Sequence, residues 1–104
     1  MSFAIDGSDI HLNNPYSAGQ SVSFEFEVHN TSGMNTTGHN VDHVDVIDNG
    51  GAKVLDQDFQ GMAVGSGQSY RTIVQGPVLG AGTYDVVVNV DGGAARAGAT
   101  IIVQ

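Results

Sequence analysis

Two runs of the chain place an apolar residue at every second position. They are residues 21–29, SVSFEFEVH, and residues 83–91, TYDVVVNVD, and each follows a glycine-containing turn. This spacing matches the pleat of a β-strand, whose side chains point to opposite faces in turn, and does not match the period of a helix. Both runs are therefore predicted to be strands with one buried face.

Further short extended segments fill the rest of the chain, separated by turn residues such as Asn-Pro, Asp-Asn-Gly-Gly and Asp-Gly-Gly. We predict no helix and seven strands, over residues 3–12 with a possible break at Gly7, 21–29, 41–47, 53–59, 70–75, 83–91 and 96–104. Short strands at this spacing favour two antiparallel sheets packed face to face. We therefore predict one all-β domain over residues 1–104, an immunoglobulin-like β-sandwich of about seven antiparallel strands with Greek-key connections.

Alternation within the strands predicts the core. The inward residues are expected to be Val22, Phe24, Phe26, Val28, Val44, Val46, Tyr70, Thr72, Val74, Tyr84, Val86, Val88, Val90, Ala97, Ala99, Ile101 and Val103. Asp42 has the same parity as Val44, but we expect it to reach solvent because it lies near the start of its strand. Strand 70–75 is placed beside strand 21–29, which brings Arg71 near Glu25 or Glu27.

Two local features refine this fold. Residues 48–51, Asp-Asn-Gly-Gly, predict a tight hairpin between strands 41–47 and 53–59. Tyr84 follows Gly-Ala-Gly-Thr at the start of the penultimate strand, where its hydroxyl could bond to the backbone of the preceding crossover, as in a tyrosine corner. A plain core tyrosine fits the same position equally well.

The charge balance excludes several kinds of partner. Eleven acidic residues stand against Lys53, Arg71 and Arg96, which gives a formal net charge of −8. Such a surface repels phosphate backbones and anionic lipid, so no nucleic-acid binding is predicted. No apolar stretch approaches the roughly 20 residues that cross a bilayer, so we predict no membrane insertion. The chain has no cysteine, which excludes disulfides, thiolate metal sites and cysteine nucleophiles.

Several segments together resemble the bacterial CARDB domain, a cell-adhesion-related module. PYSAGQSVSFEFEVHNTSG resembles its opening, and HVDVIDNGGAKV, VGSGQSY and GTYDVVVNVD resemble its later strands, so the likeness covers residues 10–104. The acidic ending common in that family is replaced by DGGAARAGATIIVQ. The resemblance implies a non-catalytic, extracellular or cell-surface module of a larger secreted microbial protein, acting as a spacer, an adhesive unit or an accessory domain. Its implied partners are neighbouring domains or another protein.

No residue set predicts an enzyme. Ser66 lies between Gly65 and Gly67, but no helix follows it as a nucleophile elbow requires, so it is interpreted as a linker serine. Asp42, Asp45 and Asp48 lie close in sequence, yet an acid and base pair needs a cleft and two contrasting environments. Neither is predicted here.

Calcium is the metal hypothesis, and no other cofactor is expected. Asp48, Asn49 and Asp91 lie in two glycine-containing turns that offer carboxylate and carbonyl oxygens, although turn chemistry explains the same residues. His39 and His43 would lie about 13 Å apart on a strand that rises about 3.3 Å per residue, too far to share one ion. His43 and Asp45 share an outward face, but two ligands do not make a zinc site.

Three further alternatives concern binding. The long loop after residue 29 supplies candidate contact residues, namely Asn35, Thr36, Thr37, Gly38 and His39. Its NTTG segment weakly resembles a loop of chagasin-like cysteine-protease inhibitors, although their Pro and Arg-Pro-Trp-type segments are missing. A calcium-stabilised adhesin repeat is the second alternative. Self-association is the third, through an apolar stripe of outward-facing Ile47, Val87 and Ile102.

Overall fold

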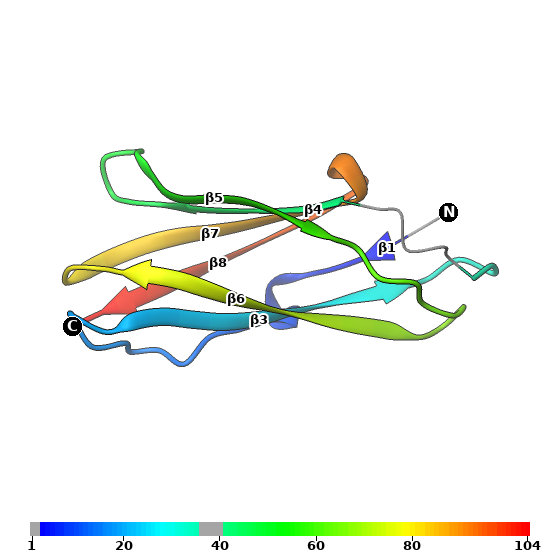
Figure 1. The fold of residues 1–104 in the computed structure, drawn as a ribbon, viewed down its shortest axis with the longest axis horizontal. Helices are drawn as coiled ribbons and strands as arrows, with labels where there is room; N and C mark the ends of the chain where they lie inside the picture. The colour runs from blue at the N-terminus through cyan, green and yellow to red at the C-terminus, as the bar shows by residue number, and fades with distance from the viewer. Residues whose placement is uncertain (1–2, 36–40) are drawn as a thin grey trace.

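The computed structural model describes residues 3–35 and 41–104, and these residues form two antiparallel sheets packed face to face (Figure 1). The first sheet contains β1 (Phe3–Ala4), β2 (Ile10–His11), β3 (Ser21–Asn30) and β6 (Ser69–Val78). The second has the order β5 (Lys53–Gln60), β4 (Val41–Ile47), β7 (Gly82–Val90) and β8 (Ala95–Val103). The predicted all-β immunoglobulin-like sandwich is confirmed. It measures 43 × 22 × 17 Å, and β1 and the end of β8 lie toward opposite ends of its long axis.

The first predicted strand is broken into two short pieces, as Gly7 suggested. β1 and β2 pair with the same edge of β3, and a 3-10 turn, η1 (Gly7–Asp9), separates them. Asp6 caps this turn: its Oδ1 accepts the backbone N–H of Ser8 at 2.8 Å, while Asp9 Oδ2 accepts the N–H of Asp6 at 2.8 Å. The turn packs closely against β8: a Cβ atom on Gly7 would lie only 3.0 Å from the carbonyl oxygen of Gly98.

The core follows the predicted alternation. Every predicted inward residue is buried except Thr72, Tyr84 and Ala99, which are half-buried. Phe26 is fully buried and meets Phe59 of the opposite sheet edge to face, with ring centroids 6.3 Å apart. The pleat therefore seals apolar side chains between the two layers, as the sequence predicted.

The predicted hairpin is confirmed, and the structure decides between the two interpretations of Tyr84. The Tyr84 hydroxyl donates to the carbonyl oxygen of Gly80 at 2.8 Å, which makes a tyrosine corner. The hairpin after β4 closes through the N–H of Gly51, which donates to Asp48 O at 3.0 Å, and Gly51 has a φ of 85°. β6 pairs with β3, and Arg71 lies 3.2 Å from a Glu27 carboxylate oxygen and 3.7 Å from one of Glu25.

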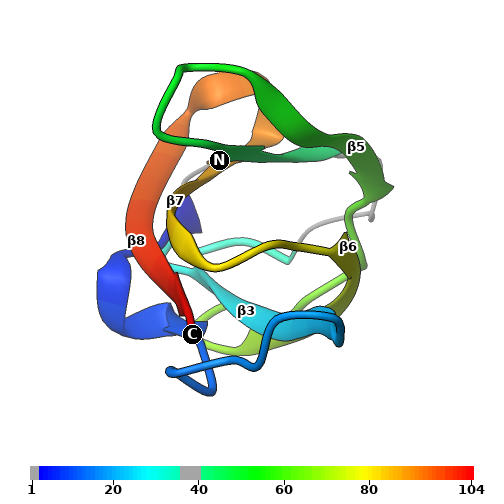
Figure 2. The same ribbon diagram turned by 90° about the vertical axis from the view of Figure 1, so that its left-hand side faces the viewer.

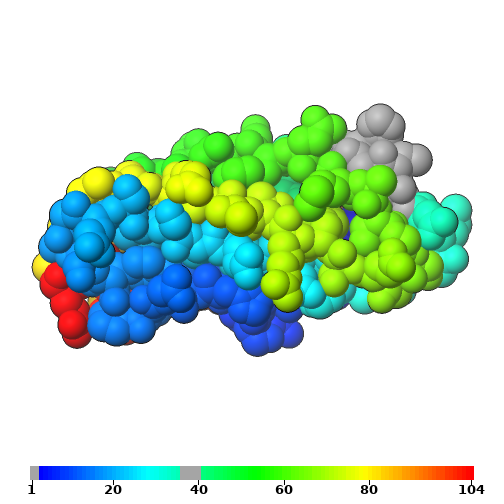
Figure 3. Space-filling view, turned by 60° about the horizontal axis from the view of Figure 1, so that its bottom comes forward, coloured from blue at the N-terminus to red at the C-terminus, as the bar shows by residue number. Residues whose placement is uncertain are grey.

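One flank of the sandwich is closed by the segment that joins β2 to β3. Asn14 donates its side-chain amide to Thr100 O and accepts the N–H of Ile102, both at 2.8 Å. The Tyr16 backbone adds two further bonds of 2.8 Å, to Ile102 O and from the N–H of Gln104. This segment covers the outer edge of β8, whereas β5 and β6 lie on the other flank (Figure 2). In Figure 3, residues 10–20 follow one side of β3 and β6 follows the other.

Candidate functional site

β4 sends two consecutive titratable side chains to opposite faces of the second sheet. Asp42 points into the sandwich and is fully buried, while His43 points outward. Across the ladders, His43 stands opposite Asp58 of β5 and Asn89 of β7. The outward position therefore receives acidic neighbours from the adjacent hairpin strand.

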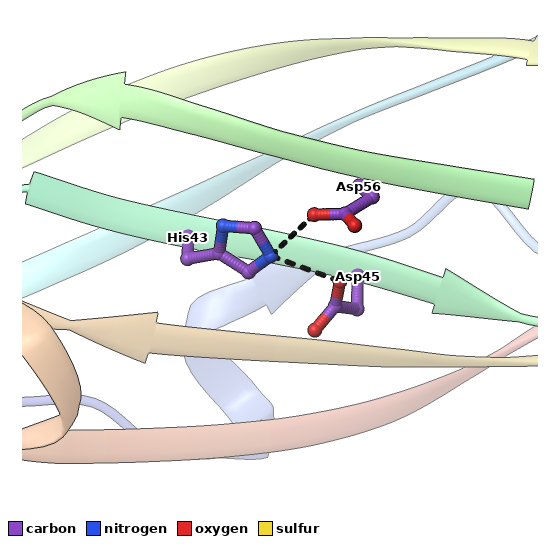
Figure 4. Close-up of side chains that lie close together, drawn as sticks. All are labelled: His43, Asp45 and Asp56. Carbon is purple, nitrogen blue, oxygen red and sulfur yellow. Dashed lines mark hydrogen bonds and ion pairs between the residues drawn. The ribbon is translucent and has the colours of Figure 1, made fainter. Parts of the chain in front are cut away.

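Three carboxylates contact His43, and Lys53 contacts two of them. We call these five residues the histidine cluster: His43, Asp45, Asp56, Asp58 and Lys53. His43 Nδ1 lies 2.5 Å from Asp58 Oδ1, and Nε2 lies 2.9 Å from Asp45 Oδ1 and 2.8 Å from Asp56 Oδ1. Figure 4 shows Asp45 and Asp56 converging on Nε2. Lys53 Nζ approaches Asp45 at 3.3 Å, on the side away from Asp58.

The arrangement favours the protonated imidazole. A neutral ring donates from one nitrogen only, but both ring nitrogens of His43 face carboxylate oxygens. Hydrogen bonds with Asp58 and then Asp45 raise the pKa of His43 above its ordinary value. When protonated, His43 pairs with three carboxylates on the outer face.

The same atoms could hold a metal ion once His43 loses its proton. His43 Nε2 and one oxygen each of Asp45 and Asp56 lie within 4.8 Å of one another. One imidazole nitrogen with two carboxylate oxygens is a ligand set used for zinc and other first-row metals. A depression of about 340 Å³ lies beside the cluster and is lined in part by His43, Asp58 and Asn89.

The sequence predicted only part of this cluster. It placed His43 and Asp45 on one outward face, which is confirmed, but it did not include the residues from β5. The hairpin brings them in, because Asp45 stands opposite Asp56 and His43 opposite Asp58 in the β4–β5 register. Counting back from the turn could have suggested this pairing, although a register shift between Val46 and Ile47 displaces a simple count.

The calcium candidates are separated by the fold. Asp48 and Asn49 lie in the hairpin after β4, and Asp91 lies in η2 (Asp91–Gly93), next to the start of β4, so they cannot share one ion. Asp48 Oδ1 accepts the backbone N–H groups of Gly50 and Ala52, each at 2.9 Å. The Asp48 carboxylate thus has the turn-forming role that the sequence offered as the alternative.

The loop candidates are only partly described. Asn35 Oδ1 accepts the backbone N–H of Ser66 at 3.0 Å, and the Ser66 hydroxyl donates to Ser32 O at 2.6 Å. Ser66 therefore ties two loops together, which agrees with its interpretation as a linker serine. Thr36, Thr37, Gly38 and His39 lie outside the described residues.

The expectation that Asp42 reaches solvent is wrong. Its strand parity directs the side chain inward, and η2 packs beside the start of β4, so Asp42 is 0% exposed. Tyr70 of the opposite sheet donates its hydroxyl to Asp42 Oδ2 at 2.5 Å, while Asp42 Oδ1 has no hydrogen-bond partner within residues 3–35 and 41–104. Burial raises the pKa of Asp42, and it also raises the pKa of Tyr70.

The proposed apolar stripe on the outer face is interrupted. Ile47 stands opposite Asp85, and Val87 stands opposite Asp45, so carboxylates lie between the apolar side chains. Ile102 pairs with Thr83, farther along β7. None of these three residues is therefore the direct cross-strand partner of another.

Comparisons with known proteins show similarity of fold. Protein-family models and curated proteins gave no match. Among solved structures, the CARDB domain of a Pyrococcus furiosus protein, described as a complex with di-metal ions, matches with a TM-score of 0.68 and 14% identity, over 99% of this chain and 88% of that one. A solution structure of the same CARDB domain matches with a TM-score of 0.68 and 16% identity, over 99% and 97% of the two chains.

A larger enzyme contains a similar domain. A Paenibacillus cycloisomaltooligosaccharide glucanotransferase matches with a TM-score of 0.70 and 18% identity, over 98% of this chain but only 14% of that one. In the described residues, no helix is long and apolar enough to span a membrane. The architecture and these neighbours show that the chain has a CARDB-like immunoglobulin fold.

Proposed function

We propose that the chain is a non-catalytic module of a larger secreted or cell-surface microbial protein, in which it separates neighbouring parts and presents binding surfaces. The observation that carries this proposal is the placement of β1 and the end of β8 toward opposite ends of a sandwich 43 Å long. A domain threaded in this way keeps the segments joined to its two ends apart. The matched CARDB domains and the small share of the glucanotransferase that is matched support a modular role.

The spacer role can be tested by placing the chain between two fluorescent proteins and measuring energy transfer on single molecules. We expect one narrow distance distribution, because a packed sandwich does not change its length. Phe26→Ala provides the matched disruption, since removing a buried phenylalanine costs about 3–5 kcal/mol and should broaden the distribution. A distribution as broad as that of a Gly/Ser linker of equal length would contradict the spacer role.

The surface location needs its own experiment. An antibody against the chain should label intact cells of the source organism without permeabilisation. Labelling that requires permeabilised cells would contradict a secreted or surface-exposed module, and would leave the spacer role to be decided by energy transfer.

Divalent-cation binding at the histidine cluster is a second candidate function. It is favoured by the convergence of three ligand atoms from His43, Asp45 and Asp56. The similar P. furiosus domain is described as a complex with di-metal ions, which adds support at the level of the fold. Because the raised pKa of His43 makes a proton compete with the metal, binding should strengthen as pH rises.

Calorimetric titration with zinc and, separately, calcium tests this candidate. Zinc should bind the unmodified chain and lose most of its affinity in His43→Ala. His11→Ala is the matched control, since His11 is an exposed histidine on β2 of the other sheet. Binding that persists in His43→Ala, or no binding at pH 8, would contradict a metal site in the cluster.

A further inference from the structure

The open flank of the sandwich carries two strand edges that differ in chemistry. β5 presents Asp56, Asp58 and Lys53 from the histidine cluster, and charged side chains of this kind discourage pairing with another chain. β6, with the sequence SYRTIVQGPV, contains no acidic residue although the whole chain has a net charge of −8. Of the two open edges, β6 is therefore the one whose side chains would repel an added strand least.

The backbone of β6 has unpaired groups along its outer edge. The N–H of Asn30 donates to Gln68 O at 2.8 Å, and hydrogen-bonded pairs recur at every second residue of an antiparallel ladder. The N–H and C=O groups of Tyr70, Thr72 and Val74 therefore face β3. Those of Ser69, Arg71, Ile73 and Gln75 face away, and within residues 3–35 and 41–104 no strand pairs with this edge.

Protection of the β6 edge is confined to one end. A Cβ on Gly76 would lie 2.0 Å from Val22 O, at the register shift between Ser21 and Ser23, and Pro77 follows. Bulges and prolines block pairing where they occur. From Ser69 to Gln75 the edge has neither, and in its middle Ile73 is 63% exposed.

We propose that two copies of this chain pair antiparallel through their β6 edges, with Ile73 of one copy opposite Ile73 of the other. This register makes Ile73 a hydrogen-bonded pair, because its backbone groups face the free edge, and it places Arg71 opposite Gln75. No two like charges then stand directly opposite each other. A second copy fits because the edge is self-complementary about a two-fold axis, which a closed dimer requires.

The charge of the chain predicts how this pairing depends on salt. Each copy carries a net charge of −8, and Glu25 and Glu27 lie one strand behind β6. The two copies therefore repel each other at long range, and added salt screens that repulsion. Dimerisation through β6 should strengthen as ionic strength rises, whereas an association held by ion pairs would weaken.

Sedimentation velocity up to about 1 mM, at low and high salt, tests the proposal. We expect a reversible dimer that Ile73→Lys reduces at least tenfold in affinity. Ile102→Lys is the matched control, since Ile102 is 41% exposed on β8, whose edge is already covered, and it should leave the dimer intact. A monomer at every concentration, or a dimer that Ile73→Lys does not weaken, would overturn the proposal.

A crosslinking experiment fixes the register. The chain has no cysteine, so Ile73→Cys introduces a single thiol at the proposed two-fold axis. Hydrogen-bonded antiparallel pairs have Cα atoms about 5.5 Å apart, within the range that a disulfide bridges. Under mild oxidation Ile73→Cys should form a covalent dimer much faster than Ile102→Cys, and equal rates would contradict this register.

Discussion

Asp42 and His43 are consecutive residues of β4, yet they meet opposite environments. Asp42 points into the sandwich, where the Tyr70 hydroxyl donates to one oxygen of its carboxyl group and the other oxygen has no hydrogen-bond partner among the described residues. His43 points outward, where three carboxylates approach its ring and its side chain is 30% exposed. The buried Asp42 carboxyl group therefore differs from the His43 ring in exposure as well as in the number of its contacts. Because removing the partner of a buried polar group costs more than breaking an exposed ion pair, we expect Asp42 to affect the free energy of unfolding more than His43 does.

The strongest way to break this comparison is to remove the hydroxyl that donates to the buried carboxyl group of Asp42. Tyr70→Phe keeps the ring in the core but deletes the hydroxyl that donates to Asp42 Oδ2. Because leaving a buried acceptor without its donor costs about 1–3 kcal/mol, we expect the free energy of unfolding in urea to fall by that amount. Tyr84→Phe is the matched control, since it removes an exposed hydroxyl bond and should cost about 1 kcal/mol. Equal losses would mean that burial does not set the difference.

A second prediction concerns the sign of the pH dependence at Asp42. Burial raises the folded pKa of Asp42, so its ionisation is less favourable in the folded state than in the unfolded state. The stability associated with the protonated carboxyl is present below the ordinary pKa of about 3.9 and is lost as pH rises through the folded value. Asn does not ionise, so Asp42→Asn does not lose this stability as pH rises. The free energy of unfolding of Asp42→Asn minus that of the unmodified chain should therefore increase from pH 4 to pH 7.

The control for this comparison is Asp85→Asn, which removes an exposed carboxylate from the outer face of the same sheet. It should not reproduce the rise seen with Asp42→Asn. If the difference between Asp42→Asn and the unmodified chain shrinks as pH increases, the sign assigned to the Asp42 carboxyl is wrong.

The two sites also show how far the sequence predicts this molecule. Alternation fixes which side chains face inward, so the core, the sandwich and the side of β4 that carries His43 were predictable. The burial of Asp42 was not predictable, because it depends on η2, which is distant in sequence and packs beside the start of β4. Asp56 and Asp58 were missed for a related reason: they join His43 only through the hairpin register, and a register shift alters that pairing.

The smallest expected effect is at the outer site. The carboxylates raise the folded pKa of His43, so its stabilisation is present in full below the ordinary histidine pKa of about 6.5 and is lost as pH rises through the folded value. His43→Gln should therefore lower the free energy of unfolding by up to about 1 kcal/mol at pH 6, and by progressively less toward pH 9. His29→Gln gives a second test, because the pKa of His29 is also raised, chiefly by a hydrogen bond with Asp9. The loss of unfolding free energy in His29→Gln should therefore also become smaller as pH rises. If the loss of unfolding free energy in His43→Gln stays constant with pH, the ring stabilises the fold by packing rather than by its charge. That result would also remove the reason to expect that a proton competes with a metal ion at the histidine cluster.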